Sequence, residues 1–393
     1  MSVSIIGTAH TKFGKLDKDI YELIKEVGKE ALIDSGVNTT DIGGIWVGNY
    51  SGGGFNNQEH IAPTALEIDE KLRFTPATRV ENACASGSAA IKAAIEAIEA
   101  GSCDYALVIG AEKMTSLDTK GITKVLAMAS NWKTEGSQGM TFPGLFAEFA
   151  KGYMAKFDKS EEEMREILAM ISAKNYQNAL ENPYAHLPLN VTAEDILNLP
   201  DKKNPMIAYP LRLNDCSLIS DGAAAIVLTR TDIAKKSDKE AVEIKAIVQA
   251  TDYLEIKKRD NFHFEGAKVA VNKAYEQAGI TVDDLSFAEV HDCFTIAELL
   301  AYEAIGLVEN GNERSVLDNK IVMPGGKLPI NISGGLKAKG HPVGTTGVSM
   351  AVLATRQLLN KAIGKQIENP KYGLTLNFGG SAVSNYATIY KKL

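Results

Sequence analysis

The stretch ALIDSGVNTTDIGGIWV, residues 31–47, returns in altered form as AYEQAGITVDDLSFAEV, residues 274–290 of this 393-residue chain. Each copy begins in the last turns of an amphipathic helix, passes through a glycine and a short acidic turn, and ends in an apolar strand. Gly36 of the first copy aligns with Gly279 of the second, and each glycine is placed to end its helix. The pattern predicts two copies of one α/β unit.

Two further matches follow in the same order along the chain. CASG at residues 84–87 aligns with HPVG at residues 341–344, and YALVI at residues 105–109 aligns with YGLTL at residues 372–376. One such match can arise by chance wherever strands and helices alternate, but three in a common order support a duplication. The predicted fold is therefore a layered α/β structure made of two similar halves.

A segment without a counterpart in the second copy interrupts the first half. We predict an N-terminal half over residues 1–115, completed by residues 208–235, an inserted loop domain over residues 116–207, and a C-terminal half over residues 236–393. Within the insertion, Ser160 and Glu163 have the spacing of a capping box that opens a long helix. The proline-rich loops of the insertion favour a lid or binding subdomain. The alternative is an inserted segment that stabilises a dimer.

Composition and charge exclude several classes of protein. With 45% hydrophobic and 23% charged residues the chain is typical of a globular protein, and its net charge of −7 argues against a nucleic-acid partner. The four cysteines show no paired spacing, which indicates neither a disulfide framework nor a zinc site and favours a reducing cytoplasm. No signal pattern and no apolar run of about 18 residues is present, so no membrane partner is expected.

Cys84 and His341 occupy equivalent positions in the two copies, each shortly before a predicted helix. If the halves pack with pseudo-symmetry, the loops that carry this thiol and this imidazole meet. A helix N-terminus lowers the pKa of a nearby thiol, and an imidazole can accept its proton. The alternative is structural, with Cys84 as a small apolar residue in a turn and His341 as a hydrogen-bonded loop residue.

A second group of reactive side chains follows the predicted strand FAEV, residues 287–290. His291, Asp292 and Cys293 lie at its end, where the first copy has only a glycine and an asparagine at residues 48–49. This asymmetry predicts a site that is complete in one half only. The alternative is a satisfied His–Asp pair beside a buried thiol.

Four of these segments together resemble the active-site loops of the thiolase superfamily. They are NACASG at residues 82–87, HDCF at residues 291–294, GHP at residues 340–342 and NFGGS at residues 377–381. The HDCF form is similar to that of the archaeal and sterol-carrier-protein-2-type branch, and the resemblance covers the whole chain. It implies a five-layered αβαβα sandwich of two duplicated halves, with an inserted loop domain that helps to bind coenzyme A.

The resemblance also implies a reaction and its main groups. The reaction is the Claisen condensation of two acetyl-CoA molecules to acetoacetyl-CoA and CoA, or the thiolytic reverse. Cys84 is implied as the nucleophile that becomes acetylated, and His341 as the group that activates it. Cys293 is implied as the second acid/base, which removes the α-proton of the incoming acetyl-CoA.

Hydrogen-bond donors for the negative charge are implied in the same way. His291 would donate to the thioester oxygen of the enolate, with His341 as a co-donor. The N–H groups of Cys84 and Gly379 would form a second oxyanion hole, and Gly380 replaces Gly379 if the alignment slips by one residue.

Two positions need separate interpretation. Many thiolases place the acid/base cysteine where this chain has Asn377, and here Cys293 would supply the thiol from another loop. Ser217 matches a position that contacts the pantetheine chain of CoA, and its alternative is a turn residue before a strand.

The resemblance implies no permanently bound cofactor and no metal, because CoA thioesters are the substrates. It implies a homodimer or homotetramer. Since condensation of two acetyl-CoA is thermodynamically unfavourable, we expect a partner that consumes the product. The expected partner is a hydroxymethylglutaryl-CoA synthase of mevalonate synthesis, with a small OB-fold protein that bridges the two enzymes. Alternatives are a 3-ketoacyl-CoA thiolase or related condensing enzyme with longer acyl chains, and a noncatalytic lipid- or CoA-binding scaffold. The intact set of Cys84, His291, Cys293 and His341 argues against the scaffold.

Overall fold

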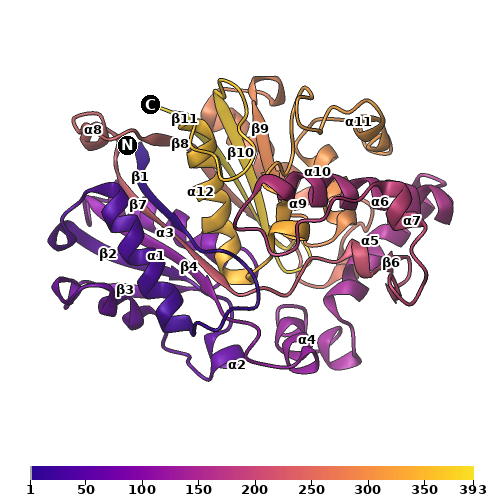
Figure 1. The fold of residues 1–393 in the computed structure, drawn as a ribbon, viewed down its shortest axis with the longest axis horizontal. Coiled ribbons are helices and arrows are strands. Elements are labelled where there is room, and N and C mark those ends of the chain that lie inside the picture. Colours follow the sequence, from indigo (N-terminus) through magenta and orange to yellow (C-terminus); the bar gives the residue numbers. More distant parts are fainter. Residues whose placement is uncertain (1) are drawn as a thin grey trace.

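One mixed sheet of nine strands runs through the protein in this computed structural model, which describes residues 2–393 (Figure 1). The N-terminal half contributes β1 (Val3–His10), β2 (Ile42–Gly48), β3 (Ala77–Val80), β4 (Tyr105–Glu112) and β7 (Gly222–Arg230). The C-terminal half contributes β8 (Val242–Thr251), β9 (Phe287–Val290), β10 (Tyr372–Gly379) and β11 (Ser384–Lys392). The strand order is β3-β2-β4-β7-β1-β8-β11-β10-β9, and antiparallel pairing of β1 with β8 joins the halves.

The two halves repeat one topology. The order β2-β4-β7-β1 recurs as β9-β10-β11-β8, with a parallel first pair and two antiparallel pairs in each half. Helix α1 (Ile20–Ser35) corresponds to α9 (Glu265–Ala278), and both end at a glycine with positive φ, 69° at Gly36 and 67° at Gly279. A residue without Cβ adopts this conformation readily. The duplication predicted from the sequence repeat is confirmed.

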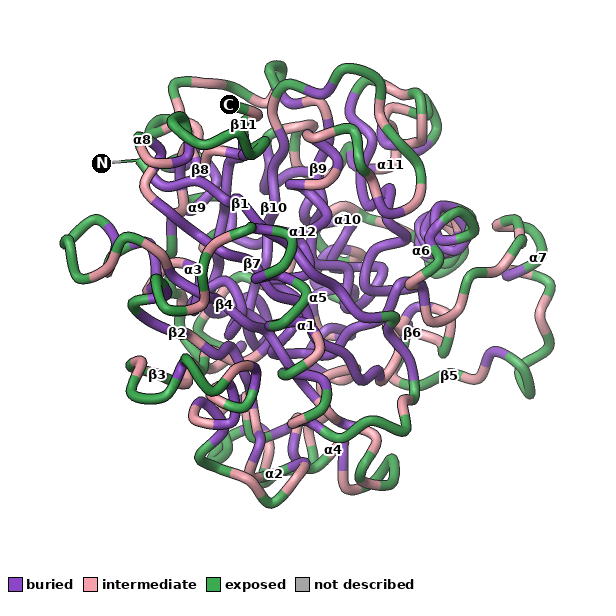
Figure 2. The backbone as a smooth tube through the Cα atoms, turned by 60° about the vertical axis from the view of Figure 1, so that its left-hand side comes forward, coloured by how far each residue is buried: buried purple, intermediate pink, exposed green. Residues whose placement is uncertain are grey.

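Five layers follow from how the helices cover the sheet. Helix α1 packs on the outer face of the N-terminal half, while α9 and α10 (Thr295–Ala304) cover the outer face of the C-terminal half. Between the halves, α3 (Ser86–Glu99) packs against α12 (Thr346–Leu358). The predicted αβαβα sandwich is confirmed, and Figure 2 shows most of its strands as buried backbone inside a more exposed shell of loops.

The crossing of α3 and α12 is unusually close. A Cβ added to Gly87 would lie 2.8 Å from the backbone nitrogen of Val348 and 3.0 Å from the carbonyl oxygen of Gly344. Glycine therefore permits backbone-to-backbone contact between the halves. This contact brings the start of α3 next to the start of α12, and with them the loops that carry Cys84 and His341.

Local sequence signals explain where the helices begin. Asp19 and Glu22 form a capping box at the start of α1, and Ser160 with Glu163 forms the predicted capping box of α6 (Glu161–Asn178). Six apolar residues of α1 recur at helical spacing and face the core. They are Ile20, Leu23, Ile24, Val27, Ala31 and Leu32.

The segment over residues 116–207 lies on one side of the sandwich, beside the C-terminal half (Figure 1). It contains α4 (Thr119–Ala127), α5 (Phe142–Lys156), α6, α7 (Ala193–Leu197) and β5 (Met206–Ala208), which pairs with β6 (Leu211–Arg212). Helices α5 and α6 share a hydrophobic core with α10. The remaining helices are α2 (Gly52–Asn56), α8 (Thr231–Ala234) and α11 (Arg314–Asp318). Across residues 2–393, no helix has the length and apolarity needed to cross a bilayer.

Candidate active site

The reactive groups of the two halves meet where their loops converge. Cys84 lies between β3 and α3, His291 and Cys293 follow β9, and His341 lies shortly before α12. The Cys84 Sγ and one ring nitrogen each of His291 and His341 lie within 4.8 Å of one another. Cys84 and His341, 257 positions apart in the sequence, thus belong to one cluster. The side chains of Cys84, His291, Cys293 and His341 are at most 8% exposed.

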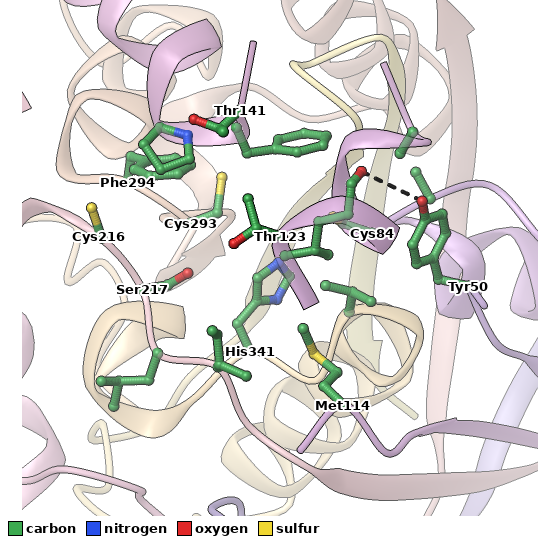
Figure 3. Close-up of a pocket in the computed structure, with 18 of the residues that line it drawn as sticks. Tyr50, Cys84, Met114, Thr123, Thr141, Cys216, Ser217, Cys293, Phe294 and His341 are labelled. Atoms are coloured by element: carbon green, nitrogen blue, oxygen red, sulfur yellow. Dashed lines mark hydrogen bonds between the residues drawn. The ribbon is translucent and has the colours of Figure 1, made fainter. Parts of the chain in front are cut away.

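A cavity of about 470 Å³ opens beside this cluster. Figure 3 shows Cys84, Cys293, His341 and Ser217 arranged around the same space. Most of the lining is apolar and comes from both halves and from the inserted segment. The apolar lining residues include Met114, Leu126, Phe142, Ile207, Leu213, Leu218, Phe294 and Val343. Such a lining suits an acyl chain or the thioester arm of a larger substrate.

His341 is arranged as a proton acceptor. Its Nδ1 lies 2.7 Å from the Thr346 hydroxyl, which itself donates to the carbonyl oxygen of Pro342 at 3.1 Å. Because the single hydroxyl proton is engaged there, Nδ1–H donates to the Thr346 oxygen and Nε2 carries the lone pair. Burial, followed by the positive charge of Lys339, lowers the pKa of His341 to about 3, so the ring is neutral.

His291 is fully buried, and its Nδ1 faces a hydrogen-bond donor where that of His341 faces an acceptor. Its Nδ1 lies 2.8 Å from the amide nitrogen of Asn377, and Phe378 packs against the ring with 4.3 Å between centroids. Within residues 2–393, its Nε2 has no hydrogen-bond partner. Burial, and then the neighbouring His341 and Lys339, hold the pKa of His291 well below its usual value.

Cys84 is a thiol rather than a thiolate in the free protein. Burial raises its pKa to about 12, while hydrogen bonds from the backbone N–H groups of Gly380 and of Cys84 itself act in the opposite direction. The sequence led us to expect a pKa lowered by the start of α3, and that expectation is wrong because desolvation of the sulfur outweighs the helix end. The Cys84 sulfur therefore needs a base before it can act as a nucleophile.

Cys293 and Ser217 are joined through the backbone. The N–H of Ser217 donates to the carbonyl oxygen of Cys293 at 2.9 Å, and both residues line the cavity. Burial, followed by Cys84 and Asp292, raises the pKa of Cys293 well above its usual value. The structure thus places a second protonated thiol near the first.

Asp292 connects three segments of the site. Its carboxylate accepts from the backbone N–H of Leu336 at 2.6 Å and of Lys337 at 3.1 Å, and from the Asn175 amide at 2.7 Å. Asn175 belongs to α6 of the inserted segment, and the two N–H groups belong to the short π-helix Gly335–Lys339 that leads to His341. Asp292 therefore pairs with these groups and fixes the positions of neighbouring loops.

Two family models match the sequence and together span almost the whole chain. The Thiolase, N-terminal domain matches residues 3–232, and the Thiolase C-terminal domain-like family matches residues 248–392. The chain belongs to the thiolase family. The resemblance inferred from the four loops is confirmed.

Similar proteins place this thiolase near the expected branch. Acetyl-CoA acetyltransferase of Methanothermobacter thermautotrophicus is 38% identical, with 99% of each chain covered. The protein of the same name from Methanocaldococcus jannaschii is 40% identical, with 96% of each chain covered. Sterol carrier protein 2 of Gallus gallus is 31% identical over 97% of this chain and 70% of its own.

Solved structures share the fold at low sequence identity. The Ltp2-ChsH2(DUF35) aldolase has a TM-score of 0.82 at 21% identity, covering 98% of this chain and 97% of the other. Acetyl-CoA acetyltransferase from Syntrophomonas wolfei has a TM-score of 0.74 at 18% identity, covering 100% and 98%. Both comparisons support the thiolase fold.

One residue that organises the thiolase site was missed from the sequence. Glu112, at the end of β4, is fully buried and accepts from the backbone N–H groups of Tyr50 at 2.8 Å, Ser51 at 3.2 Å and Gly344 at 3.0 Å. It therefore ties the loop after β2 to the loop after His341. A lone glutamate ending an apolar strand was the available signal, because a buried carboxylate requires several donors.

The glycine turn after β10 lies against the nucleophile loop. A Cβ on Gly379 would lie 2.2 Å from the carbonyl oxygen of Asn82, and Gly380, with φ of 64°, presents its N–H to the Cys84 sulfur. Of the two glycines considered from the sequence, Gly380 is thus the one whose N–H faces the thiol. Asn377, noted only as a departure from the cysteine of many thiolases, contacts both Cys84 and His291.

Proposed function

We propose that this thiolase catalyses the Claisen condensation of two acetyl-CoA molecules to acetoacetyl-CoA and CoA, and the thiolytic reverse, through an acetyl-Cys84 intermediate. The observation that carries the proposal is the cluster of Cys84, His291 and His341 within 4.8 Å, beside Cys293 and an apolar cavity. The two archaeal relatives named acetyl-CoA acetyltransferase, at 38% and 40% identity, add support for these substrates.

In the first step, the Cys84 sulfur attacks the thioester carbon of acetyl-CoA while its proton passes to Nε2 of His341. The negative oxygen that forms is held by the N–H groups of Cys84 and Gly380, because the latter already faces the sulfur. The C–S bond to CoA then breaks, and the CoA sulfur takes the proton from His341. Cys84 is left acetylated, and His341 is neutral again.

In the second step, the proton of Cys293 passes to Nε2 of His341, and the Cys293 thiolate removes the α-proton of a second acetyl-CoA. His291 and the protonated His341 donate to the enolate oxygen as it becomes negative. The enolate carbon attacks the acetyl group, the bond to Cys84 breaks, and the Cys84 sulfur takes the proton from His341. All four groups return to their starting protonation states.

The substrate is held, in this proposal, by the inserted segment over residues 116–207 and by Ser217. Thr123, Thr141 and Phe142 of that segment line the cavity. Ser217 lies on the wall beside Cys293 (Figure 3). A pantetheine chain entering between them reaches the thiols without a permanently bound cofactor. The domain boundaries given above follow from the same assignment.

A second candidate is a 3-ketoacyl-CoA thiolase that accepts longer acyl chains. The apolar lining of the cavity, with Leu126, Phe142, Leu213 and Phe294 among its residues, favours it. Comparison of kcat/KM for acetoacetyl-CoA and 3-ketooctanoyl-CoA separates the two. The acetyltransferase proposal requires a clear preference for the shorter substrate.

Assembly and pathway form a further part of the proposal. We propose that this thiolase forms a homodimer or homotetramer in the cytoplasm. Because condensation of two acetyl-CoA is thermodynamically unfavourable, a partner that consumes acetoacetyl-CoA would draw the reaction forward. We propose a hydroxymethylglutaryl-CoA synthase as this partner, at the start of mevalonate synthesis. A small OB-fold bridging protein is part of the proposal because the chain resembles the archaeal branch of the family. The Ltp2-ChsH2(DUF35) aldolase is a two-component assembly with the same fold. Isolation at native expression levels without either partner would oppose this part.

The direct test is thiolysis of acetoacetyl-CoA by the purified protein. The decrease in absorbance of the acetoacetyl-CoA enolate measures the rate. Wild type is expected to turn over, and Cys84→Ala to lose at least about 10⁴-fold in kcat, as loss of a nucleophile does. Activity of Cys84→Ala within about tenfold of wild type would refute the covalent intermediate.

A further inference from the structure

We infer that Asn377 is a positioning residue that locks His291 in the tautomer with its proton on Nε2, which makes His291 a hydrogen-bond donor and withholds Nε2 from metal ions. The inference deepens the proposed function and rests on it for the role of the donor. The lock itself is a property of the free protein.

The orientation of the Asn377 side chain is fixed by its neighbours. The carbonyl oxygen of Cys84 lies 3.3 Å from Nδ2, and a carbonyl can only accept, so the amide nitrogen must face it. On the other side, Oδ1 accepts from the Ser88 hydroxyl at 2.7 Å. Asn377 is 1% exposed, so water offers no alternative partner and a flipped amide would place two oxygens together.

The second hydrogen of the same amide nitrogen determines the state of His291. It points at Nδ1, 2.8 Å away, and an N–H donor requires a lone pair there. The neutral ring must then carry its proton on Nε2. This N–H is buried and lacks a partner among the described residues 2–393, so it remains available to donate to a substrate oxygen.

The same cluster would otherwise suit a soft metal ion. Cys84 Sγ and the ring nitrogens of His291 and His341 lie within 4.8 Å of one another, and a thiolate with two imidazoles is a typical ligand set for Zn²⁺. Coordination by Nε2 of His291 needs a lone pair on that atom. With Asn377 donating to Nδ1, the lone pair is on the wrong nitrogen.

Asn377→Asp reverses the lock with little change in volume. A carboxylate can only accept, so it would draw the His291 proton to Nδ1 and leave a lone pair on Nε2, as carboxylates do behind metal-bound histidines. Asn377→Leu removes the lock without adding a charge. Ser88→Ala is the matched control, since it removes one contact to Oδ1 and leaves the amide donor facing His291.

The first measurement reads the tautomer in the free protein. With ¹⁵N-labelled histidine, NMR of wild type is expected to show His291, assigned by loss of its signals in His291→Gln, with a proton on Nε2 and none on Nδ1. A proton on Nδ1 would overturn the inference. Because this readout needs no substrate, it stands or falls independently of the proposed function.

The second measurement compares catalysis with zinc sensitivity. Asn377→Asp is expected to lose about 10²–10³-fold in condensation kcat, the cost of one oxyanion donor, while acetylation of Cys84 falls much less. Zn²⁺ should inhibit Cys84 acetylation in Asn377→Asp at a concentration at least about tenfold lower than in wild type, with reversal by EDTA. Replacing His291 by alanine in the same chain should abolish that gain.

Other outcomes contradict the inference. Equal zinc sensitivity of wild type, Asn377→Leu and Asn377→Asp would show that Asn377 does not control the His291 lone pair. Condensation by Asn377→Asp within about threefold of wild type would show that the tautomer is irrelevant to the donor. If Asn377→Asp does not fold, Asn377→Leu and the wild-type NMR decide the question.

Discussion

The rings of His291 and His341 lie edge to face, with 4.9 Å between their centroids and 90° between their planes. Their Nδ1 atoms face opposite kinds of partner: an amide donor of Asn377 for His291, and the oxygen of Thr346 for His341. One neutral imidazole therefore presents an N–H at Nε2, and the other presents a lone pair. In this thiolase site, His291 is therefore a hydrogen-bond donor and His341 a proton acceptor.

Loss of Cys293 should separate the two half-reactions. Cys293→Ala is expected to acetylate Cys84 at a rate near that of wild type, and to lose about 10²–10⁴-fold in condensation because the base for the α-proton is gone. Rapid quenching with mass spectrometry measures the first step, and acetoacetyl-CoA formation measures the second. Cys216→Ala is the matched control, a thiol on the same cavity wall whose Sγ contacts the carbonyl oxygen of Arg212. Failure of Cys293→Ala to acetylate would overturn the division of roles.

The reactivity of Cys84 in the free enzyme should rise steadily with pH. Burial raises its pKa to about 12. At any pH below this value, the thiolate fraction increases about tenfold for each unit by which the pH rises. Alkylation by iodoacetamide, mapped to the Cys84 peptide by mass spectrometry, is expected to climb from pH 7 to pH 10 without levelling, as the thiolate fraction predicts. A plateau below pH 8 would instead reveal a standing thiolate–imidazolium pair with His341.

Asp292→Asn should loosen the loops around the site. The substituted amide turns an N–H group towards the donors of Leu336 and Lys337, which loses at least one buried hydrogen bond and costs about 1–3 kcal/mol of unfolding free energy. Urea denaturation measures the loss, and kcat should fall as well because the loop before His341 shifts. The control is Asp283→Asn, an exposed partner of Lys327 that should change stability by less than about 0.5 kcal/mol. Equal stability of the two variants would contradict the role of Asp292 in holding these segments together.

Gly87→Ala should disturb the contact between the halves. The new methyl would meet backbone atoms of Val348 and Gly344, which cannot move aside as a flexible side chain could, so we expect a loss of about 1–3 kcal/mol and slower acetylation of Cys84. Thermal unfolding and the acetylation rate provide the readouts. Gly144→Ala in the first turn of α5 is the matched control, because the nearest atom to its Cβ is the Thr141 hydroxyl at 3.7 Å. A neutral Gly87→Ala would show that the crossing is more tolerant than its geometry implies.

The sequence predicted those features that rest on local patterns and on order along the chain. The aligned glycines Gly36 and Gly279, the capping box at Ser160 and the strand that ends each copy of the repeat, β2 and β9, are of this kind, since each is encoded within a few residues. The duplication predicted that Cys84 and His341 meet, because equivalent loops of a pseudo-symmetric pair face each other.

Features that depend on three-dimensional surroundings could not be predicted in this way. Neither the short strand β3 nor β11 was anticipated, as their residues lack strong strand periodicity. The raised pKa of Cys84 follows from burial by distant segments, which outweighs the local effect of α3. The roles of Glu112 and Asn377 depend on groups from distant segments that fold against them, such as the backbone N–H of Gly344 for Glu112 and the ring of His291 for Asn377.

The central claim is that acetyl groups pass through Cys84, and one measurement tests it most directly. The enzyme is mixed with acetyl-CoA labelled in the acetyl group, quenched in acid within milliseconds, digested, and analysed by mass spectrometry. In wild type the label is predicted on Cys84 and then in acetoacetyl-CoA when a second acetyl-CoA is added, and Cys84→Ala should carry none. Label on another residue, or labelled acetoacetyl-CoA formed by Cys84→Ala, would contradict the account.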